Sequence, residues 1–183
     1  HHPPDMPDWY MDGLHLQNLL TDTRWLRSEP NLRLIIAMGD NLKQWCEQQW
    51  PQIPCVAIKH PTGEPLCYWS PDSFLANRKH KVVQVGWFLR NVLAIYQARV
   101  SDSYHKIHLF QQNEWAKRMD AACRTAYQTR EAVGTVERID GLDDYRYDML
   151  LAESVVLIEV ISAVANNTIV ECIARNTPIC VNR

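Results

Sequence analysis

Short apolar runs recur along the chain, and longer segments of mixed polarity separate them. Each run is rich in branched side chains and is bounded by glycine, proline or small polar residues, which is typical of a buried strand. The run from Leu32 to Met38, for example, ends at Gly39. The pattern predicts strands over residues 32–38, 55–58, 81–85, 133–139, 155–161 and 179–182.

The segments between these runs have approximately helical spacing of their apolar residues. Asp143 or Asp144 is suited to cap one helix, and Asn166 or Asn167 is suited to cap the last one. The pattern predicts helices over residues 14–20, 42–50, 145–152 and 166–175, and a long, mostly helical stretch over 87–130 that breaks near 99–103.

The alternation of strands with helices favours crossover connections and therefore mostly parallel sheets. The strands predicted at 155–161 and 179–182 are almost continuously apolar, which fits a sheet covered on both faces. The right-handed rule for such crossovers favours helices on both sides of the sheet. We therefore expect an α/β protein with Rossmann-like, three-layer domains and mostly parallel sheets.

A proline-rich loop at residues 61–80 is the best candidate for a linker. It contains Pro61, Gly63, Pro65 and Pro71, which disfavour regular structure. We therefore expect one domain to end by residue 60 and a second domain to occupy residues 81–183.

Composition narrows the class of protein. The 183 residues are 46% hydrophobic and 22% charged, which is ordinary for a soluble globular protein. The formal net charge of −2 gives no support for a nucleic-acid partner, and no apolar run approaches the roughly 18 residues that span a bilayer. Six cysteines without a C-x-x-C pair predict reduced core thiols in a cytoplasmic protein. With no initiator Met and no signal peptide, the sequence looks like a fragment or a processed product.

In an open α/β sheet, ligands bind beyond the carboxyl ends of the strands. The loop 162–167 is built of small residues and leads into a predicted helix, whose free N–H groups and positive dipole end suit a diphosphate. Glu171 lies about one turn into that helix, where its carboxylate can accept hydrogen bonds from ribose hydroxyls. The simpler alternative is that Asn166 and Asn167 only cap the helix and that Glu171 is solvated.

The segment 165–178 resembles the nucleotide-sugar site of GT-B glycosyltransferases, and 82–90 resembles the first strand and loop of their donor domain. The resemblance implies that Gly86 and Arg90 approach the donor diphosphate, with Lys106 as a further cation. It also implies that Glu171 binds the donor ribose. The loop 140–142 would meet the base, and the start of the last helix would complete the donor site with Asn166, Asn167 and Thr168.

The amino end resembles the end of a GT-B acceptor domain. The resemblance implies that His1 or His2 acts as a base or positions an acceptor hydroxyl, although a histidine pair left from a purification tag is the alternative. Residues 1–60 would then be the end of the acceptor domain, and 81–183 an incomplete donor domain. The acidic cluster around Asp144 lacks calcium-loop spacing, so we expect no bound metal.

The resemblance implies a hexosyltransferase-like enzyme that moves a sugar from a nucleotide-sugar to a hydroxyl of a glycan or other acceptor. A retaining outcome and no cofactor are expected from the resemblance alone. The family's first glutamate falls at Ala163, which supports an alternative: a catalytically inactive relative that serves as a binding or structural subunit. The oligomeric state, including a homo-oligomer, stays open.

Overall fold

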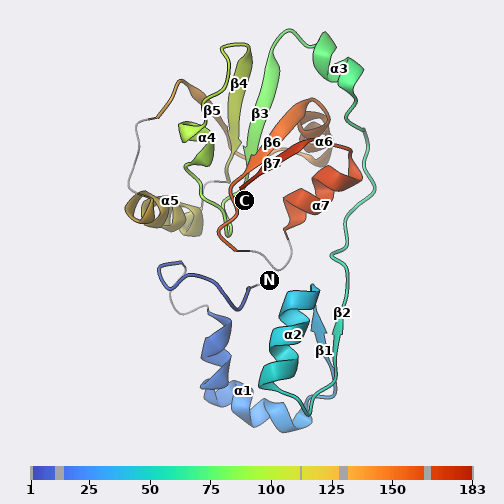
Figure 1. Cartoon of the computed structure of the whole chain (residues 1–183), viewed down its shortest axis with the longest axis vertical. Helices are drawn as coiled ribbons and strands as arrows, with labels where there is room; N and C mark the ends of the chain where they lie inside the picture. The colour runs from blue at the N-terminus through green and yellow to red at the C-terminus, as the bar shows by residue number, and fades with distance from the viewer. Residues whose placement is uncertain (1, 11–14, 112, 128–131, 163–165, 183) are drawn as a thin grey trace. The chain divides into compact units, whose positions relative to one another are not determined.

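The computed structural model describes residues 2–10, 15–111, 113–127, 132–162 and 166–182. The chain forms two compact units (Figure 1). The first comprises His1–Pro61 with Ser162–Asn167, and the second comprises Thr62–Ile161 with Thr168–Arg183.

The first unit is a small α/β assembly. Its two short strands, β1 (Ile35–Ala37) and β2 (Cys55–Ala57), pair in parallel, with Ile35 opposite Cys55. The core of the unit lies between these strands and α2 (Asp40–Gln49), with Trp25 and Trp45 packed against the buried Trp50. The remaining elements are η1 (Leu16–Leu20), α1 (Thr23–Ser28) and η2 (Glu29–Asn31).

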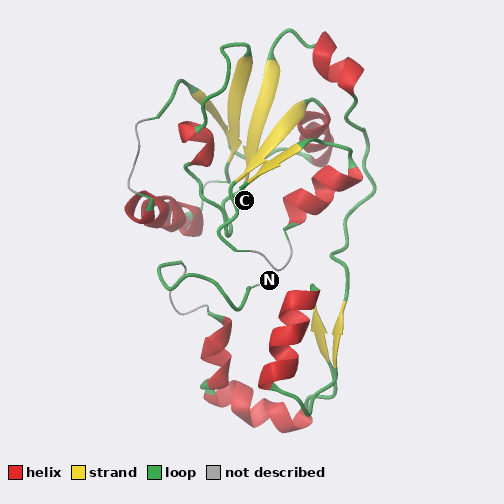
Figure 2. Ribbon diagram, in the orientation of Figure 1, coloured by secondary structure: helices red, strands yellow, loops and turns green. Residues whose placement is uncertain are grey.

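The second unit contains a five-stranded sheet in which every pairing is parallel (Figure 2). The strand order is β5-β4-β3-β6-β7, the Rossmann-like order in which the chain starts at the centre and winds outward both ways. The α/β prediction is therefore confirmed. The strands are β3 (His80–Val85), β4 (Tyr104–Leu109), β5 (Val136–Ile139), β6 (Ser154–Ile158) and β7 (Ile179–Val181). The helices are α3 (Pro71–Ala76), α4 (Ala94–Gln97), α5 (Glu114–Ala126), α6 (Asp144–Ala152) and α7 (Asn167–Ala174).

Helices cover both faces of this sheet. On one face, α5 and the residues just before α4 bury a cluster that includes Leu93, Phe110 and Cys123. On the other face, α6 and α7 bury Leu151 and Cys172 against the strands. Figure 1 shows the resulting layers, with α4 and α5 to the left of the strands and α6 and α7 to the right.

The structure corrects the prediction of a mostly helical stretch over 87–130, because that stretch contains the whole of β4. The sequence of β4 includes Lys106 and His108, which interrupt the apolar run that identifies a buried strand, yet both are almost fully buried. Residues 71–76, inside the predicted linker, form α3, which Ser70 caps by accepting a hydrogen bond from the Ser73 amide at 3.2 Å.

No helix of the described residues is both long and apolar enough to cross a membrane. All six cysteines are free thiols, and four of them are buried. Cys180 is exposed and Cys67 is half-buried, so the prediction of core thiols holds for four positions.

Candidate functional site

The loops that follow β3 and β6 meet at the carboxyl edge of the second unit's sheet. The Asn91 amide donates to the Glu159 carbonyl at 2.9 Å, and the Ile161 amide donates to the Leu89 carbonyl at 2.9 Å. β3 and β6 are neighbours whose connections run in opposite directions, which is the point where ligands bind in doubly wound sheets. The geometry therefore places a candidate site at the ends of these two strands.

Gly86 and Arg90, both predicted to face a diphosphate, lie together in the first of these loops. Gly86 has φ +69°, and a Cβ added there would lie 2.7 Å from Arg90 Nη1, so the turn requires glycine. The Arg90 guanidinium is buried and donates a hydrogen bond to the Val85 carbonyl at the end of β3. Arg90 thus folds back onto its own strand and fixes the shape of the loop.

The other predicted donor-binding residues cluster at the start of α7. The helix begins at Asn167, which is exposed, and Asn166 directly precedes it. Thr168 is buried in the first turn, and Glu171 is half-buried one turn further on. Ala163 lies outside the described residues.

The predicted acceptor-side histidines belong to the amino-terminal part of the chain. His1 lies outside the described residues. His2 is half-buried in the first unit, and burial is the main reason that its pKa is lowered.

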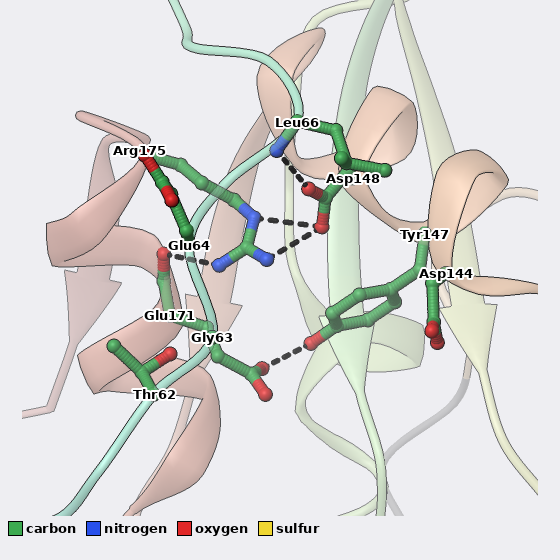
Figure 3. A pocket seen from close by; sticks show the side chains of 9 residues that line it. All are labelled: Thr62, Gly63, Glu64, Leu66, Asp144, Tyr147, Asp148, Glu171 and Arg175. Carbon is green, nitrogen blue, oxygen red and sulfur yellow. Dashed lines mark hydrogen bonds and ion pairs between the residues drawn. The ribbon is translucent and has the colours of Figure 1, made fainter.

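A cavity of about 340 Å³ opens beside Glu171, between α6, α7 and the incoming chain (Figure 3). The incoming chain, Thr62–Leu66, crosses the two helices as one wall, and we call this segment the strap. The residues that line the cavity are Thr62, Gly63, Glu64, Leu66, Asp144, Tyr147, Asp148, Glu171 and Arg175.

The Glu171 carboxylate is held from across the cavity by Tyr147. The Tyr147 hydroxyl donates to Glu171 Oε2 at 2.5 Å (Figure 3). Burial, followed by the hydrogen bond to the Glu171 carboxylate, raises the pKa of Tyr147 far above its usual value, so the phenol stays protonated and acts as a donor. A hydrogen bond between the Thr168 side chain and the same hydroxyl lowers the pKa of Tyr147, and this effect is the smaller one. Tyr147 therefore links two of the predicted donor-binding residues.

A buried ion pair closes the far end of the cavity. Asp148 Oδ1 accepts from Arg175 Nη2 at 2.5 Å and from Nε at 2.9 Å. The other oxygen, Oδ2, accepts from the Leu66 amide at 2.7 Å, which ties the strap to α6. Arg175 Nη1 donates to the Glu171 carbonyl at 3.0 Å, and the Trp69 amide donates to the Arg175 carbonyl at 2.8 Å. Asp148 thus anchors the end of the strap at Leu66, and the Arg175 carbonyl anchors the chain just beyond it at Trp69.

The chemistry of the lining favours a ligand that donates hydrogen bonds. Among the described residues around the cavity, Arg175 alone is basic, and its guanidinium is committed to Asp148 and to a carbonyl. Glu64, Asp144 and Glu171 contribute carboxylates. Hydroxyl groups therefore suit this cavity better than phosphate does.

Lys106 lies away from the carboxyl edge, contrary to the suggestion that it is a second phosphate cation. Its ammonium is buried and donates to the carbonyls of Ala98, at 3.2 Å, and of Val133. Both carbonyls belong to segments that lead into the amino ends of β4 and β5. Lys106 therefore holds the segments that precede β4 and β5 at the amino-terminal edge of the sheet.

Sequence reasoning found Glu171 but missed its partners. Tyr147, Asp148 and Arg175 act through contacts between residues 24 to 82 positions apart along the chain. The one local signal is that Tyr147 and Asp148 follow Asp144 by three and four residues, so both lie on the side of α6 that carries Asp144. That signal places the three side chains on one side of α6 without saying what they meet.

His108, a second missed residue, lies beneath the Gly86 loop. Its Nδ1 is 3.1 Å from the Tyr96 hydroxyl, and its Nε2 is 3.5 Å from the Gly86 carbonyl. Burial lowers the pKa of His108 to about 4, although the contact with the Gly86 carbonyl opposes this shift. A neutral imidazole therefore supports the loop from the α4 side of the sheet.

Among the described residues, no three His, Cys, Asp or Glu side chains are grouped so that they could hold a metal ion. No protein-family model matches the chain, and a search of curated proteins finds no match either.

Proposed function

We propose that the second unit binds a nucleotide-sugar and that the protein transfers its sugar to a hydroxyl of a glycan or other acceptor, as a GT-B-like glycosyltransferase. The observation that carries this proposal is the position of Glu171. Its carboxylate is held by Tyr147 at a cavity that suits hydroxyl donors, and α7, which carries it, begins beyond the carboxyl end of β6. A ribose diol bound there would leave the diphosphate close to the ends of β3 and β6.

The loop after β3 and the first turn of α7 would hold the diphosphate in this proposal. The Gly86 turn requires glycine and keeps the Arg90 guanidinium at the end of β3, where a cation would face the diphosphate. The first turn of α7, which contains Thr168, lies at the positive end of the helix, a position that favours an anion. Stabilising the charge that develops on the leaving diphosphate would be their main contribution to transfer.

The second candidate is a protein that binds the nucleotide-sugar, or a structural partner, without turnover. Two observations favour it: Ala163 stands at the position of the family's first glutamate, and the Arg90 guanidinium is folded back onto the Val85 carbonyl. A site with a ribose-binding carboxylate but little help for the leaving group would bind the donor and not cleave it.

A thermal-shift titration with UDP, GDP, ADP and CMP tests the donor site. We expect one nucleotide to raise the melting temperature, because a ligand that binds only the folded state stabilises it by mass action. The shift should be lost in Glu171→Gln and kept in Glu114→Gln, which changes an exposed glutamate in the first turn of α5. No shift with any of the four nucleotides at millimolar concentration would contradict the proposal.

Turnover is tested separately, with the sugar conjugate of the nucleotide that binds. Release of the free nucleotide in the presence of a mixed panel of glycan acceptors supports a transferase. Binding of the conjugate without release supports the second candidate. Comparison with Glu171→Gln shows whether any release comes from this site.

A further inference from the structure

The two oxygens of the Glu171 carboxylate differ in what they contact. Glu171 Oε2 is committed to the Tyr147 hydroxyl at 2.5 Å. Among the described residues, no group bonds the other oxygen, Oε1, and both oxygens lie at the cavity (Figure 3). One oxygen thus fixes the carboxylate while the other is left for a ligand.

The Tyr147 hydroxyl is itself fixed by the core. The ring packs against the cluster around Val83 and Leu150 and also against the cluster around Val156 and Cys172. A side chain that is held by two parts of the core has little rotational freedom, so its hydroxyl has a defined position. The ring therefore transmits the rigidity of the α6–sheet interface to a carboxylate on α7.

The hydrogen bond also has a defined direction. Burial raises the pKa of Tyr147 further above its usual value, so the phenol stays protonated and donates, and the carboxylate accepts. A hydrogen bond to a charged acceptor is stronger than a neutral one, so it holds the carboxylate in a single rotamer. Without it, Glu171 would be a half-buried side chain with several accessible rotamers.

We infer that Tyr147 is a positioning residue that gives this site its selectivity for ribose over 2′-deoxyribose. By fixing Glu171 Oε2, it orients Oε1 toward the ribose hydroxyls. This inference rests on the proposed function, since it takes Glu171 to be the ribose ligand. The Tyr147 hydroxyl bonds the Glu171 carboxylate and interacts with the Thr168 side chain, and it need not contact the nucleotide.

The test compares Tyr147→Phe with wild type by calorimetric titration of the whole chain. The ligands are whichever of UDP, GDP, ADP and CMP binds most tightly and its 2′-deoxy counterpart. Wild type should prefer the ribonucleotide about tenfold, the value of a hydrogen bond to a charged group. In Tyr147→Phe the preference should fall to about twofold, while affinity for the deoxynucleotide stays nearly unchanged.

A matched control is available on the same helix. Tyr145 lies two residues earlier in α6 and is exposed, so Tyr145→Phe removes a hydroxyl of the same kind without touching Glu171. The ribose preference of this variant should equal that of wild type. Glu171→Gln should lose the preference on its own, and adding Tyr147→Phe to it should change the preference no further, because both act through one contact.

The outcomes separate the two proposals. If wild type binds none of the nucleotides, the proposed function and this inference both fail. If wild type prefers the ribonucleotide and Tyr147→Phe keeps that preference, the inference fails and the proposed function stands. An equal loss of affinity for both nucleotides in Tyr147→Phe also overturns it, since that is the effect of a structural change. If Tyr147→Phe does not fold, Thr168→Val is the second variant: it removes a further bond to the Tyr147 hydroxyl, so the ribose preference should fall part of the way, and an unchanged preference overturns the inference.

Discussion

At the scale of single residues, the ion pair between Asp148 and Arg175 is the most consequential contact of the cavity. Their side chains are only 5% and 7% exposed. The charges are compensated because Asp148 accepts three hydrogen bonds, two from Arg175 and one from the Leu66 amide. Removing either partner would leave the other buried without its counter-charge.

We expect Asp148→Ala to lower the free energy of unfolding by about 3 to 5 kcal/mol, the usual cost of breaking a buried pair. The variant also frees the Leu66 amide, so the strap should loosen. Urea denaturation measures the first effect. Proteolytic cleavage within 62–66 under native conditions measures the second.

The exposed pair of Glu114 and Lys117 on α5 provides the comparison. Lys117→Ala should leave the urea midpoint unchanged within error, because solvent screens this pair. A loss in Asp148→Ala no larger than that in Lys117→Ala would show that the buried pair contributes nothing to stability.

His108 makes stability depend on pH in a defined window. Burial lowers its pKa from 6.5 to about 4, so the unfolded chain binds a proton more readily than the folded one. Above about pH 6.5, His108 is neutral in both states and costs no stability. As the pH falls from there to about 4, the unfolded state gains the proton first, and the stability lost reaches about 3 kcal/mol. His108→Gln should therefore lose less stability than wild type between pH 7 and pH 4.5.

Unfolding at both pH values, in wild type and in His108→Gln, isolates this residue from the carboxylates that titrate in both proteins. Parallel losses in the two proteins would contradict the shifted pKa of His108. A direct reading comes from the imidazole resonances, of which the His108 signal should titrate near pH 4.

At the scale of elements, α6 shows which of two adjacent aspartates caps a helix. The sequence allows Asp143 or Asp144 as the cap, and the structure selects Asp143, whose carboxylate accepts from the Arg146 amide at 2.8 Å. We expect Asp143→Ala to lower the free energy of unfolding by about 1 kcal/mol. Asp144→Ala should cost less, since a carboxylate in the first turn loses only its interaction with the helix dipole. Equal effects of the two variants in thermal unfolding would contradict this assignment.

The predictability of each element follows from where its stabilising contacts lie. The strand β6 is a nearly continuous apolar run, and β3 contains three valines, which is the pattern expected of a parallel sheet covered on both faces, so their sequences identify them. The pattern fails for β4, because Lys106 and His108 are buried with partners on α4 and on adjoining loops. Such contacts arise only once the sheet has formed.

The candidate site divides in the same way. Gly86 and Glu171 occur in local patterns, a strand end and the first turns of a helix, which the sequence displays. Tyr147 and Asp148 become site residues because α6 packs beside α7, and the strap becomes a wall because Leu66 meets a carboxylate 82 residues away. No spacing rule for a single segment carries that information.

At the scale of the whole molecule, the sheets of the two units differ in how strongly their contacts resist local opening. In the second unit, β3 and β6 are paired on both sides and contain the fully buried Val83 and Val156. In the part of the first unit that the structure describes, β1 and β2 pair with each other and with no further strand, and Ile36 and Val56 are 58% and 42% exposed. A parallel pair with one bare face has fewer contacts to resist local opening.

Amide hydrogen exchange should therefore rank the strands. We expect the amides of β3 and β6 to exchange most slowly, those of β5 and β7 at the sheet edges faster, and those of β1 and β2 fastest of all. Mass spectrometry of peptic fragments resolves these segments. Protection of 35–37 and 55–57 equal to that of 80–85 would show that the exposed face is covered in solution.

The strap has a consequence for how the chain tolerates changes in its length. Connecting segments usually accept inserted residues, because closing a longer loop costs little entropy. Here the amides of Leu66 and Trp69 are in register with Asp148 and with the Arg175 carbonyl. One residue inserted between Leu66 and Trp69 must loop out or break one of these two hydrogen bonds. An insertion after Lys59 lies outside the cavity lining and is expected to be absorbed.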